Sequence, residues 1–220
     1  MTQGEFTIEL NGLKLWFKVS GTGPVCLMPT PAWGPSSDLY FRTLQPLEKT
    51  FTVVYLDSRG TGRSQKAAST KDYTWEHLIA DLDALRAHLK QEKVWLMGHS
   101  QGGMQVLHYA CARPERVEGL VLLSTAAVWD EQADKDVMFR VQLRQDRPWF
   151  AEAVKALQQL EFDALGGEVV NPSVASDEGL KAVIKTIMPF YWSDPAKIAP
   201  HEEDFEATSM SATAFRGDKD

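Results

Sequence analysis

The sequence predicts an α/β protein with a mostly parallel, doubly wound sheet and a helical cap. Short continuous apolar segments recur between residues 25 and 123, as expected of strands that are buried on both faces. Segments with helical periodicity separate them, and this alternation favours a parallel sheet covered by helices on both faces. Residues 130–200 carry helical patterns only, which is typical of a helical insertion after the sheet.

The first element is predicted to be a β-hairpin. Residues 6–10 and 13–19 alternate apolar and polar side chains, and Asn11-Gly12 lies between them. Asn-Gly supplies the positive φ angles that a tight two-residue turn requires. We therefore expect an antiparallel pair at the start of the chain.

Two buried strands and two helices are predicted next. The strand over residues 25–28 opens into a proline-rich loop, and a helix over 39–47 follows, with Pro46 near its end. A strand over 51–56 leads into another loop. Thr74 is expected to cap a helix that runs to residue 90, because apolar side chains then follow the helical repeat.

A predicted strand over residues 94–97 ends in the pattern Gly98-x-Ser100-x-Gly102, and a helical segment follows at once. Glycines two residues before and after a serine permit a sharp strand-to-helix turn that leaves the Ser100 hydroxyl clear of the chain. The turn also places the N–H of Gln101 at a helix N-terminus, where negative charge is favoured. We therefore predict Ser100 as a nucleophile and Gln101 as half of an oxyanion hole.

The chain after this turn is predicted to form a helix over residues 102–112 and one more strand over 117–123. Beyond residue 129 the helices are predicted over 133–145, 149–161 and 179–189, with loops at Gly166-Gly167 and Asn171-Pro172. We therefore divide the chain into a core over residues 1–129 and a helical cap over residues 130–220. The many aromatic side chains of the cap form either its core or a ligand pocket.

Composition and charge exclude several classes of partner. The net charge is −7 and the 23 basic residues form no cluster, which argues against nucleic acid and anionic membranes. Cys26 and Cys111 lie in apolar segments without metal-ligand spacing, so we expect both to be reduced core residues. The sequence carries no signal-peptide pattern and no apolar run of membrane length, which predicts a cytoplasmic protein. It carries no dinucleotide fingerprint and no metal-ligand motif, so no cofactor is expected.

Two motifs together carry a resemblance to a known family. The turn at residues 98–103 and the segment Asp-Ser-Arg-Gly-Thr-Gly-Arg-Ser at residues 57–64, with the antiparallel start, resemble the α/β-hydrolase superfamily. The resemblance covers residues 5–129. Within the superfamily the chain is most similar to the capped branch of prolyl iminopeptidases, C–C bond hydrolases and small esterases. The resemblance implies a catalytic Ser100 with a histidine and a carboxylate as partners.

The resemblance also implies a His-Gly-Gly-Pro-Gly type loop after the third strand, whose role is to present a backbone N–H to a developing oxyanion. Thr30-Pro31-Ala32-Trp33-Gly34 stands in that place here. Pro31 has no N–H to donate. Ala32 or Trp33 is therefore expected to complete the oxyanion hole.

The sequence does not identify a catalytic base. In this fold the acid and then the histidine follow the serine along the chain. Of the two later histidines, His108 lies on the helix that leaves the turn, and His201 follows no strand; Asp220 is a candidate for the acid. We therefore expect the chain to lack the last two core strands, which would leave the strand at 117–123 as an apolar sheet edge. The expected partner at that edge is a separate C-terminal fragment or a second copy of the chain.

These observations predict a serine hydrolase, present as an incomplete chain, for an ester, amide or peptide-like acyl bond of a small molecule or short peptide. The alternative is a non-catalytic ligand-binding protein of the same fold, which the altered loop and the missing histidine allow. Dehalogenase and epoxide hydrolase activities are disfavoured, because such relatives carry Asp where Ser100 stands. Asp57 and Arg59 are expected to brace the floor of the site, because the lysine of a phosphate loop is absent.

Overall fold

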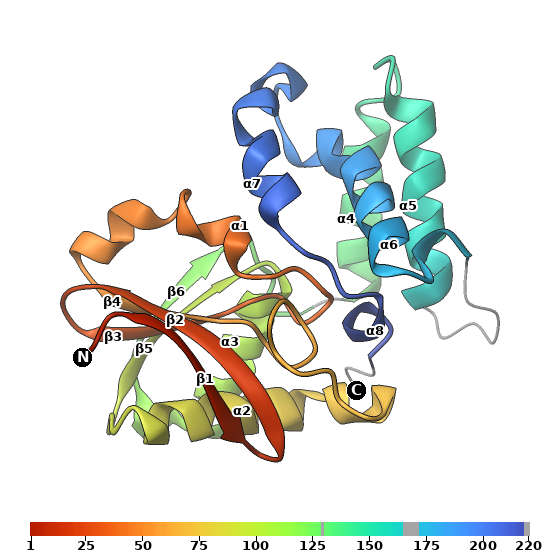
Figure 1. Ribbon diagram of the computed structural model, residues 1–220. Helices are drawn as coiled ribbons and strands as arrows, with labels where there is room; N and C mark the ends of the chain where they lie inside the picture. Colours follow the sequence, from red (N-terminus) through yellow and green to blue (C-terminus); the bar gives the residue numbers. More distant parts are fainter. Residues whose placement is uncertain (129, 165–171, 218–220) are drawn as a thin grey trace. The chain divides into compact units, whose positions relative to one another are not determined.

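The computed structural model describes residues 1–128, 130–164 and 172–217, and the chain divides into two compact units (Figure 1). The sheet unit comprises Met1–Ala127 together with the chain from Ala207 onward. The helical unit comprises Val128–Glu206. The sequence placed residues 207–220 with the helices, whereas the structure places residues 207–217 with the sheet.

The sheet has six strands in the order β1-β2-β4-β3-β5-β6. β1 pairs with β2 and β2 pairs with β4 in antiparallel fashion, whereas the pairs β3–β4, β3–β5 and β5–β6 are parallel. The predicted mostly parallel sheet with an antiparallel start is therefore confirmed. The strands are β1 (Gly4–Leu10), β2 (Leu13–Gly21), β3 (Val25–Pro29), β4 (Thr52–Leu56), β5 (Val94–His99) and β6 (Val117–Leu123).

The predicted hairpin is present at its predicted turn. Asn11 and Gly12 have φ angles of 50° and 77°, and Leu10 pairs with Leu13 across the turn. Both φ angles are positive, as a type I′ turn requires. The local sequence therefore determines the register of β1 against β2.

Helices cover both faces of the sheet (Figure 1). On one face, α2 (Trp75–His88) and α3 (Gln101–Ala112) pack Leu82 and Val106 into an apolar core with the strands. On the other face, the short helix α1 (Asp38–Phe41) packs Tyr40 into a second core cluster. Each fully buried side chain of this size contributes about 1.5–3 kcal/mol. The Thr74 side chain accepts a hydrogen bond from the N–H of His77, which confirms the predicted cap of α2.

The helix predicted over residues 39–47 is interrupted. α1 ends at Phe41, and a separate 3-10 helix, η1 (Gln45–Lys49), follows it. Pro46 lies in the first turn of η1, where its missing N–H costs nothing. In a continuous α-helix the Pro46 ring would collide with the carbonyl group of Arg42. Two further 3-10 turns of the sheet unit are η2 (Thr70–Tyr73) and η3 (Pro114–Arg116).

The helical unit contains α-helices close to the three predicted positions. Asp130 caps α4 by accepting from the N–H of Ala133, and Ser176 caps α6 by accepting from the N–H of Gly179. The α-helices are α4 (Glu131–Gln142), α5 (Phe150–Ala164), α6 (Asp177–Ile187) and α7 (Glu202–Ala207). The 3-10 helices are η4 (Pro172–Val174), η5 (Met188–Tyr191), η6 (Pro195–Lys197) and η7 (Ala199–His201).

Aromatic side chains of the helical unit pack against one another. Trp149 and Phe150 both meet the Phe190 ring edge to face, with centroid distances of 5.1 and 6.1 Å. This pairing supports the interpretation of these three aromatic residues as core.

Of the predicted loops, Gly166-Gly167 and Asn171 lie outside the described residues. No described helix is both long and apolar enough to cross a membrane.

The chain returns to the sheet unit after the helical unit. The N–H of Ser36 donates to the carbonyl oxygen of Ser209 at 2.9 Å, and the N–H of Ser209 donates to Ser36 Oγ at 3.1 Å. Thr208 and Ala214 are fully buried, and α8 (Ala212–Phe215) follows. These contacts explain why this segment belongs with the sheet. Asp220, the candidate for the catalytic acid, lies outside the described residues.

The two cysteines have different environments. Cys26 is fully buried in β3, as predicted, and burial raises the pKa of its thiol to about 12. Cys111 is exposed near the end of α3, so its prediction as a core residue is wrong. Val106 and Tyr109 of the same helix are buried in the core, whereas the position of Cys111 on the helix faces away from it. Neither cysteine forms a disulfide bond.

Candidate active site

The connection between β5 and α3 is a sharp turn centred on Ser100. This residue has φ 54° and ψ −130°, and it is the N-cap of α3. A positive φ angle is uncommon for a residue other than glycine and has to be held by its surroundings. Here the Ser100 N–H donates to the carbonyl oxygen of Leu123 at 3.0 Å, and its own carbonyl accepts from Thr125 Oγ1 at 2.7 Å.

The glycines around Ser100 are required by close packing. A Cβ atom on Gly98 would overlap the carbonyl group of Gly102 and lie 2.5 Å from the Cα of Gly103. A Cβ atom on Gly103 would lie 2.5 Å from the Cβ of Thr125. Real Cβ atoms do not approach other atoms this closely. The predicted turn is therefore present, and close packing requires Gly98 of the predicted pattern. The second glycine that it requires is Gly103, whereas a Cβ atom on Gly102 would lie 3.1 Å from its nearest atom.

The first turn of α3 carries free backbone donors. Within the described residues no acceptor pairs with the N–H of Gln101 or with that of Gly102. These groups lie at the positive end of a 12-residue helix. Such a helix end favours a negative charge placed next to Ser100.

A second pair of free donors lies in the loop after β3. Pro31 accepts from the N–H of Gly34 at 3.4 Å, so Ala32 and Trp33 are the central residues of a turn. In the part of the chain that the structure describes, neither of their N–H groups has an acceptor. Ala32 is buried and Trp33 is half-buried.

This loop and the Ser100 turn lie side by side. β3 and β5 are parallel neighbours, with Leu27 level with Leu96, so their C-terminal ends meet at the same edge of the sheet. A Cβ atom on Gly102 would lie 3.1 Å from the carbonyl oxygen of Pro29 and 3.5 Å from the nitrogen of Pro31. The loop that contains Ala32 and Trp33 therefore begins beside the turn that contains Ser100 and Gln101.

None of the five histidines is hydrogen-bonded to Ser100 in the described structure. His99 Nδ1 lies 3.1 Å from Tyr40 Oη, and burial lowers the pKa of His99. Burial also raises the pKa of Tyr40, so its hydroxyl stays protonated. His108 stacks on Trp75 at a centroid distance of 4.7 Å.

The remaining three histidines also have partners within their own units. His77 Nδ1 lies 2.8 Å from Thr74 Oγ1, and His88 meets the ring of Phe17. His201 stacks on Trp192 at 5.0 Å and lies 3.7 Å from Asp204 Oδ2, both within the helical unit.

The loop after β4 is a dense hydrogen-bonded element, as predicted for Asp57 and Arg59. The fully buried Asp57 carboxylate accepts from the N–H of Ser37 at 2.7 Å and from the N–H of Arg63 at 2.8 Å. Arg59 forms a buried two-point ion pair with Asp81, at 2.7 and 2.8 Å. Both charges are paired within the protein, which fits the bracing role predicted for this loop.

Sequence reasoning missed the polar groups that join this loop to the loop after β3. Thr30, Ser37, Ser58 and Thr61 are all buried and hydrogen-bonded there. Thr30 and Ser58 lie within two residues of the ends of the buried strands β3 and β4, and that position was the available signal. The partners could not be paired from sequence because they are 20 or more residues apart.

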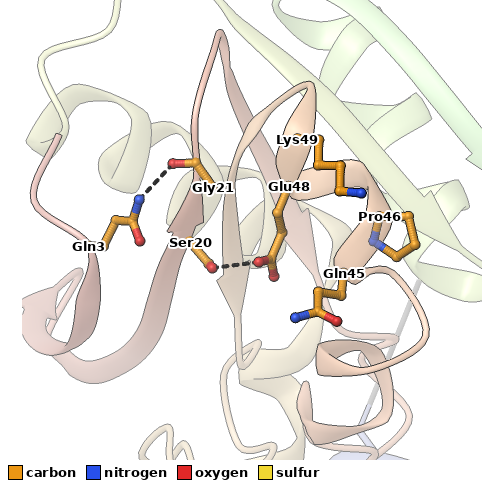
Figure 2. A pocket seen from close by; sticks show the side chains of 7 residues that line it. All are labelled: Gln3, Ser20, Gly21, Gln45, Pro46, Glu48 and Lys49. Atoms are coloured by element: carbon orange, nitrogen blue, oxygen red, sulfur yellow. Dashed lines mark hydrogen bonds between the residues drawn. The ribbon is translucent and has the colours of Figure 1, made fainter.

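One cavity of the sheet unit lies away from Ser100. A cavity of about 420 Å³ opens beside β2 and η1, where Ser20 Oγ donates to Glu48 at 2.7 Å (Figure 2). Ser20 and Gly21 belong to the end of β2 that pairs with the start of β4. Ser100 follows the C-terminal end of the parallel strand β5, so this cavity lies at the other end of the strands. Among the described residues, no group of three or more His, Cys, Asp or Glu side chains could hold a metal ion.

The sequence profile of the alpha/beta hydrolase fold family matches residues 27–167, and the chain belongs to this family. It is 34% identical over 122 residues to epoxide hydrolase 3 of Siraitia grosvenorii, and the aligned segment covers 54% of this chain and 37% of that protein. It is 30% identical over 124 residues to the proline iminopeptidase PfmaB of Pestalotiopsis fici, covering 54% of this chain and 43% of that protein. The aligned segments thus span about two fifths of these two relatives.

Solved structures show the same fold. An alpha/beta fold family hydrolase from Bacillus anthracis matches 97% of this chain and 72% of its own length, with a TM-score of 0.69 and 18% identity. The enol-lactonase of Burkholderia xenovorans matches 96% of this chain and 70% of its own length, with a TM-score of 0.62 and 20% identity. At these identities the similarity establishes the fold and no substrate.

Proposed function

We propose that this protein is a serine hydrolase acting on an ester, amide or peptide-like acyl bond. One observation carries the proposal. The strained Ser100 turn lies next to two sets of unpaired backbone N–H groups, those of Gln101 and Gly102 and those of Ala32 and Trp33. A nucleophile beside convergent donors is the arrangement that acyl transfer requires.

In this mechanism Ser100 Oγ attacks the substrate carbonyl carbon and transfers its proton to a base. The carbonyl oxygen becomes an oxyanion, which accepts hydrogen bonds from the N–H of Gln101 and from that of Ala32 or Trp33. The leaving group departs with a proton, and water then hydrolyses the acyl-enzyme. Loss of one oxyanion donor typically costs about 10²–10³ in rate.

The base and its carboxylate are supplied, in this proposal, by sequence outside these 220 residues. The histidines of the sheet unit are bonded or packed elsewhere, and His201 is stacked on Trp192. Without a base, catalysis falls to a residual enhancement of roughly 10³–10⁴ over water. The 220-residue chain by itself is therefore expected to be nearly inactive.

The identity of the nucleophile separates acyl transfer from the other activities named among the relatives. A serine hydroxyl attacks a carbonyl carbon and needs an oxyanion hole. The free N–H groups next to Ser100 meet that need. This supports an acyl substrate, in line with the name proline iminopeptidase, over the epoxide of the epoxide hydrolases.

A fluorophosphonate probe tests this function. We expect the purified chain, supplied with imidazole as an external base, to gain at Ser100 the mass of one probe minus HF, because fluoride leaves as the bond from Ser100 Oγ to phosphorus forms. Ser100→Ala should abolish the adduct, whereas His201→Ala should label at the wild-type rate. Intact mass and peptide mapping provide the measurement.

The absence of a fluorophosphonate adduct is the result that would contradict this function. No adduct at Ser100 with imidazole present, in a folded chain, would reject the hydrolase proposal. Retained binding of a small acyl compound under those conditions would favour the alternative, a non-catalytic ligand-binding protein. The observation that leaves this alternative open is that Ser100 has no hydrogen-bonded histidine in the described structure.

A further inference from the structure

The loop after β3 is attached at its beginning to the loop after β4. Thr30 Oγ1 accepts from the N–H of Ser58 at 3.0 Å and lies 2.9 Å from Thr61 Oγ1. In return, Ser58 Oγ donates to the carbonyl oxygen of Thr30 at 2.8 Å. All three residues are almost fully buried, so water does not compete for these bonds.

The same loop is attached at its other end. Asp57 Oδ1 accepts from both the N–H and the hydroxyl of Ser37, at 2.7 and 2.6 Å. Its second oxygen accepts from the N–H and the guanidinium of Arg63, at 2.8 and 3.1 Å. Arg63 in turn binds Asp38 at 2.6 Å and covers the ring of Trp16. A charged acceptor with this many donors is a rigid anchor.

Between these anchors lie the two residues with free N–H groups. Ala32 and Trp33 are the centre of the turn, and within the described residues no hydrogen bond holds their amides. Pro31 contributes no donor. The direction of the Ala32 and Trp33 amides is therefore set by the flanking anchors and not by bonds of their own.

We propose that Thr30 and Asp57 are positioning residues that hold the second oxyanion donor of the site. This inference rests on the proposed function. An oxyanion hole acts only when its donors are fixed before charge develops, and a misplacement of 1 Å costs about 10²-fold in rate. Thr30 and Asp57 touch no reacting atom and act through the position of the Ala32–Trp33 turn.

Thr30→Val tests the first anchor with little change in shape. The substitution removes the hydroxyl oxygen that pairs with Ser58 and Thr61, and Thr30→Ser restores it. We expect the maximal labelling rate of Ser100 by a fluorophosphonate to fall about 10- to 100-fold in T30V and to stay within about threefold of wild type in T30S. The probe concentration at half-maximal rate should not change.

Two further variants test whether slower labelling comes from a general loss of stability. Ser37→Ala removes one bond to Asp57 and leaves the backbone bond in place, so it should slow labelling less than T30V. Ser20→Ala removes a hydrogen bond of similar length to Glu48, at the opposite end of the sheet (Figure 2). We expect S20A to label at the wild-type rate even where its melting temperature falls as far as that of T30V.

Deuterium exchange of peptides spanning residues 30–37 gives a readout that does not depend on chemistry. Faster exchange in T30V than in T30S would show that Thr30 holds the loop. If wild type is labelled at Ser100 and folded T30V is labelled at the same maximal rate, the positioning role is refuted while the hydrolase proposal stands. If wild type is not labelled at all, the hydrolase proposal itself fails.

Discussion

At the scale of single residues, Ser100 is a strained point of the sheet unit. A residue other than glycine held at this φ angle costs of order 1–3 kcal/mol. The cost is offset by hydrogen bonds from the turn to β6 and to Thr125, and by the absence of side chains at Gly98 and Gly103. The strain therefore persists because the surrounding backbone leaves no other conformation.

Gly98→Ala tests this explanation against Gly102→Ala. The Cβ atom of G98A would overlap backbone atoms of α3, so we expect a loss of about 1–3 kcal/mol in the free energy of unfolding. The Cβ atom of G102A meets its nearest atom at 3.1 Å, and the better helix propensity of Ala offsets part of the cost. Urea unfolding measures both. Equal destabilisation of the two variants would contradict the steric account.

At the scale of elements, one carboxylate joins α2, α3 and η3. Asp83 accepts from Arg86 at 3.0 Å on its own helix, from Tyr109 Oη at 2.9 Å on α3, and from Arg116 in η3. Burial alone would raise the pKa of Asp83, but these hydrogen bonds outweigh it and lower that pKa to about 2. Asp83 thus joins α2 to α3, the helix that begins directly after Ser100.

This ion cluster predicts a pH dependence of stability. The folded pKa of Asp83 lies below its unfolded value of about 4, so its contribution is present above pH 4 and disappears as the pH falls towards 2. Asp83→Asn should lower the free energy of unfolding by about 1–2 kcal/mol at pH 7, and the difference from wild type should vanish near pH 2. Glu118→Gln, on an exposed position of β6, is the control. A difference that does not change with pH would exclude the charge as its origin.

At the scale of the whole molecule, the two edges of the sheet differ in chemistry. β1 exposes Glu5 and Glu9, and charged side chains of this kind discourage pairing with another chain. β6 pairs with β5 on one side, and in the described residues no strand lies on its other side. Its side chain Leu122 is 42% exposed. The β6 edge is therefore the face where we expect self-association.

Sedimentation velocity over a range of concentrations tests this expectation. The wild-type chain should associate reversibly as its concentration rises, because the free N–H and C=O groups of β6 pair with a second copy. Leu122→Lys should weaken the association, whereas Leu143→Lys, at an exposed apolar position of α4's C-terminal cap, should not. A chain that stays monomeric, soluble and cooperatively folded at all concentrations would refute the idea.

Local signals in the sequence were sufficient for several parts of the fold. Asn11-Gly12 specified its own turn, and the glycines around Ser100 specified the sharp connection between strand and helix. Thr74 specified the start of α2. Each of these depends on residues a few positions apart, so backbone sterics and capping act without help from the rest of the chain.

Other parts depended on partners that lie far away in the chain. The hydrogen bond between Ser36 and Ser209 joins residues 173 positions apart, and it brings the end of the chain to the sheet unit. The exposure of Cys111 likewise follows from how α3 is rotated against the sheet, which its apolar neighbours do not reveal. Pro46 was visible in the sequence, but the short 3-10 helix that it begins became evident only in the packed structure.

The amino-acid sequence by itself determined the order and type of the main elements, the mixed sheet and the Ser100 turn, because periodicity, glycine spacing and caps act over short distances. The tertiary structure decided which N–H groups near Ser100 remain free, which buried hydroxyls hold the Ala32–Trp33 turn, and where each histidine finds its partner. These outcomes depend on pairing between distant strands and loops, and that pairing is settled only when the whole core is packed.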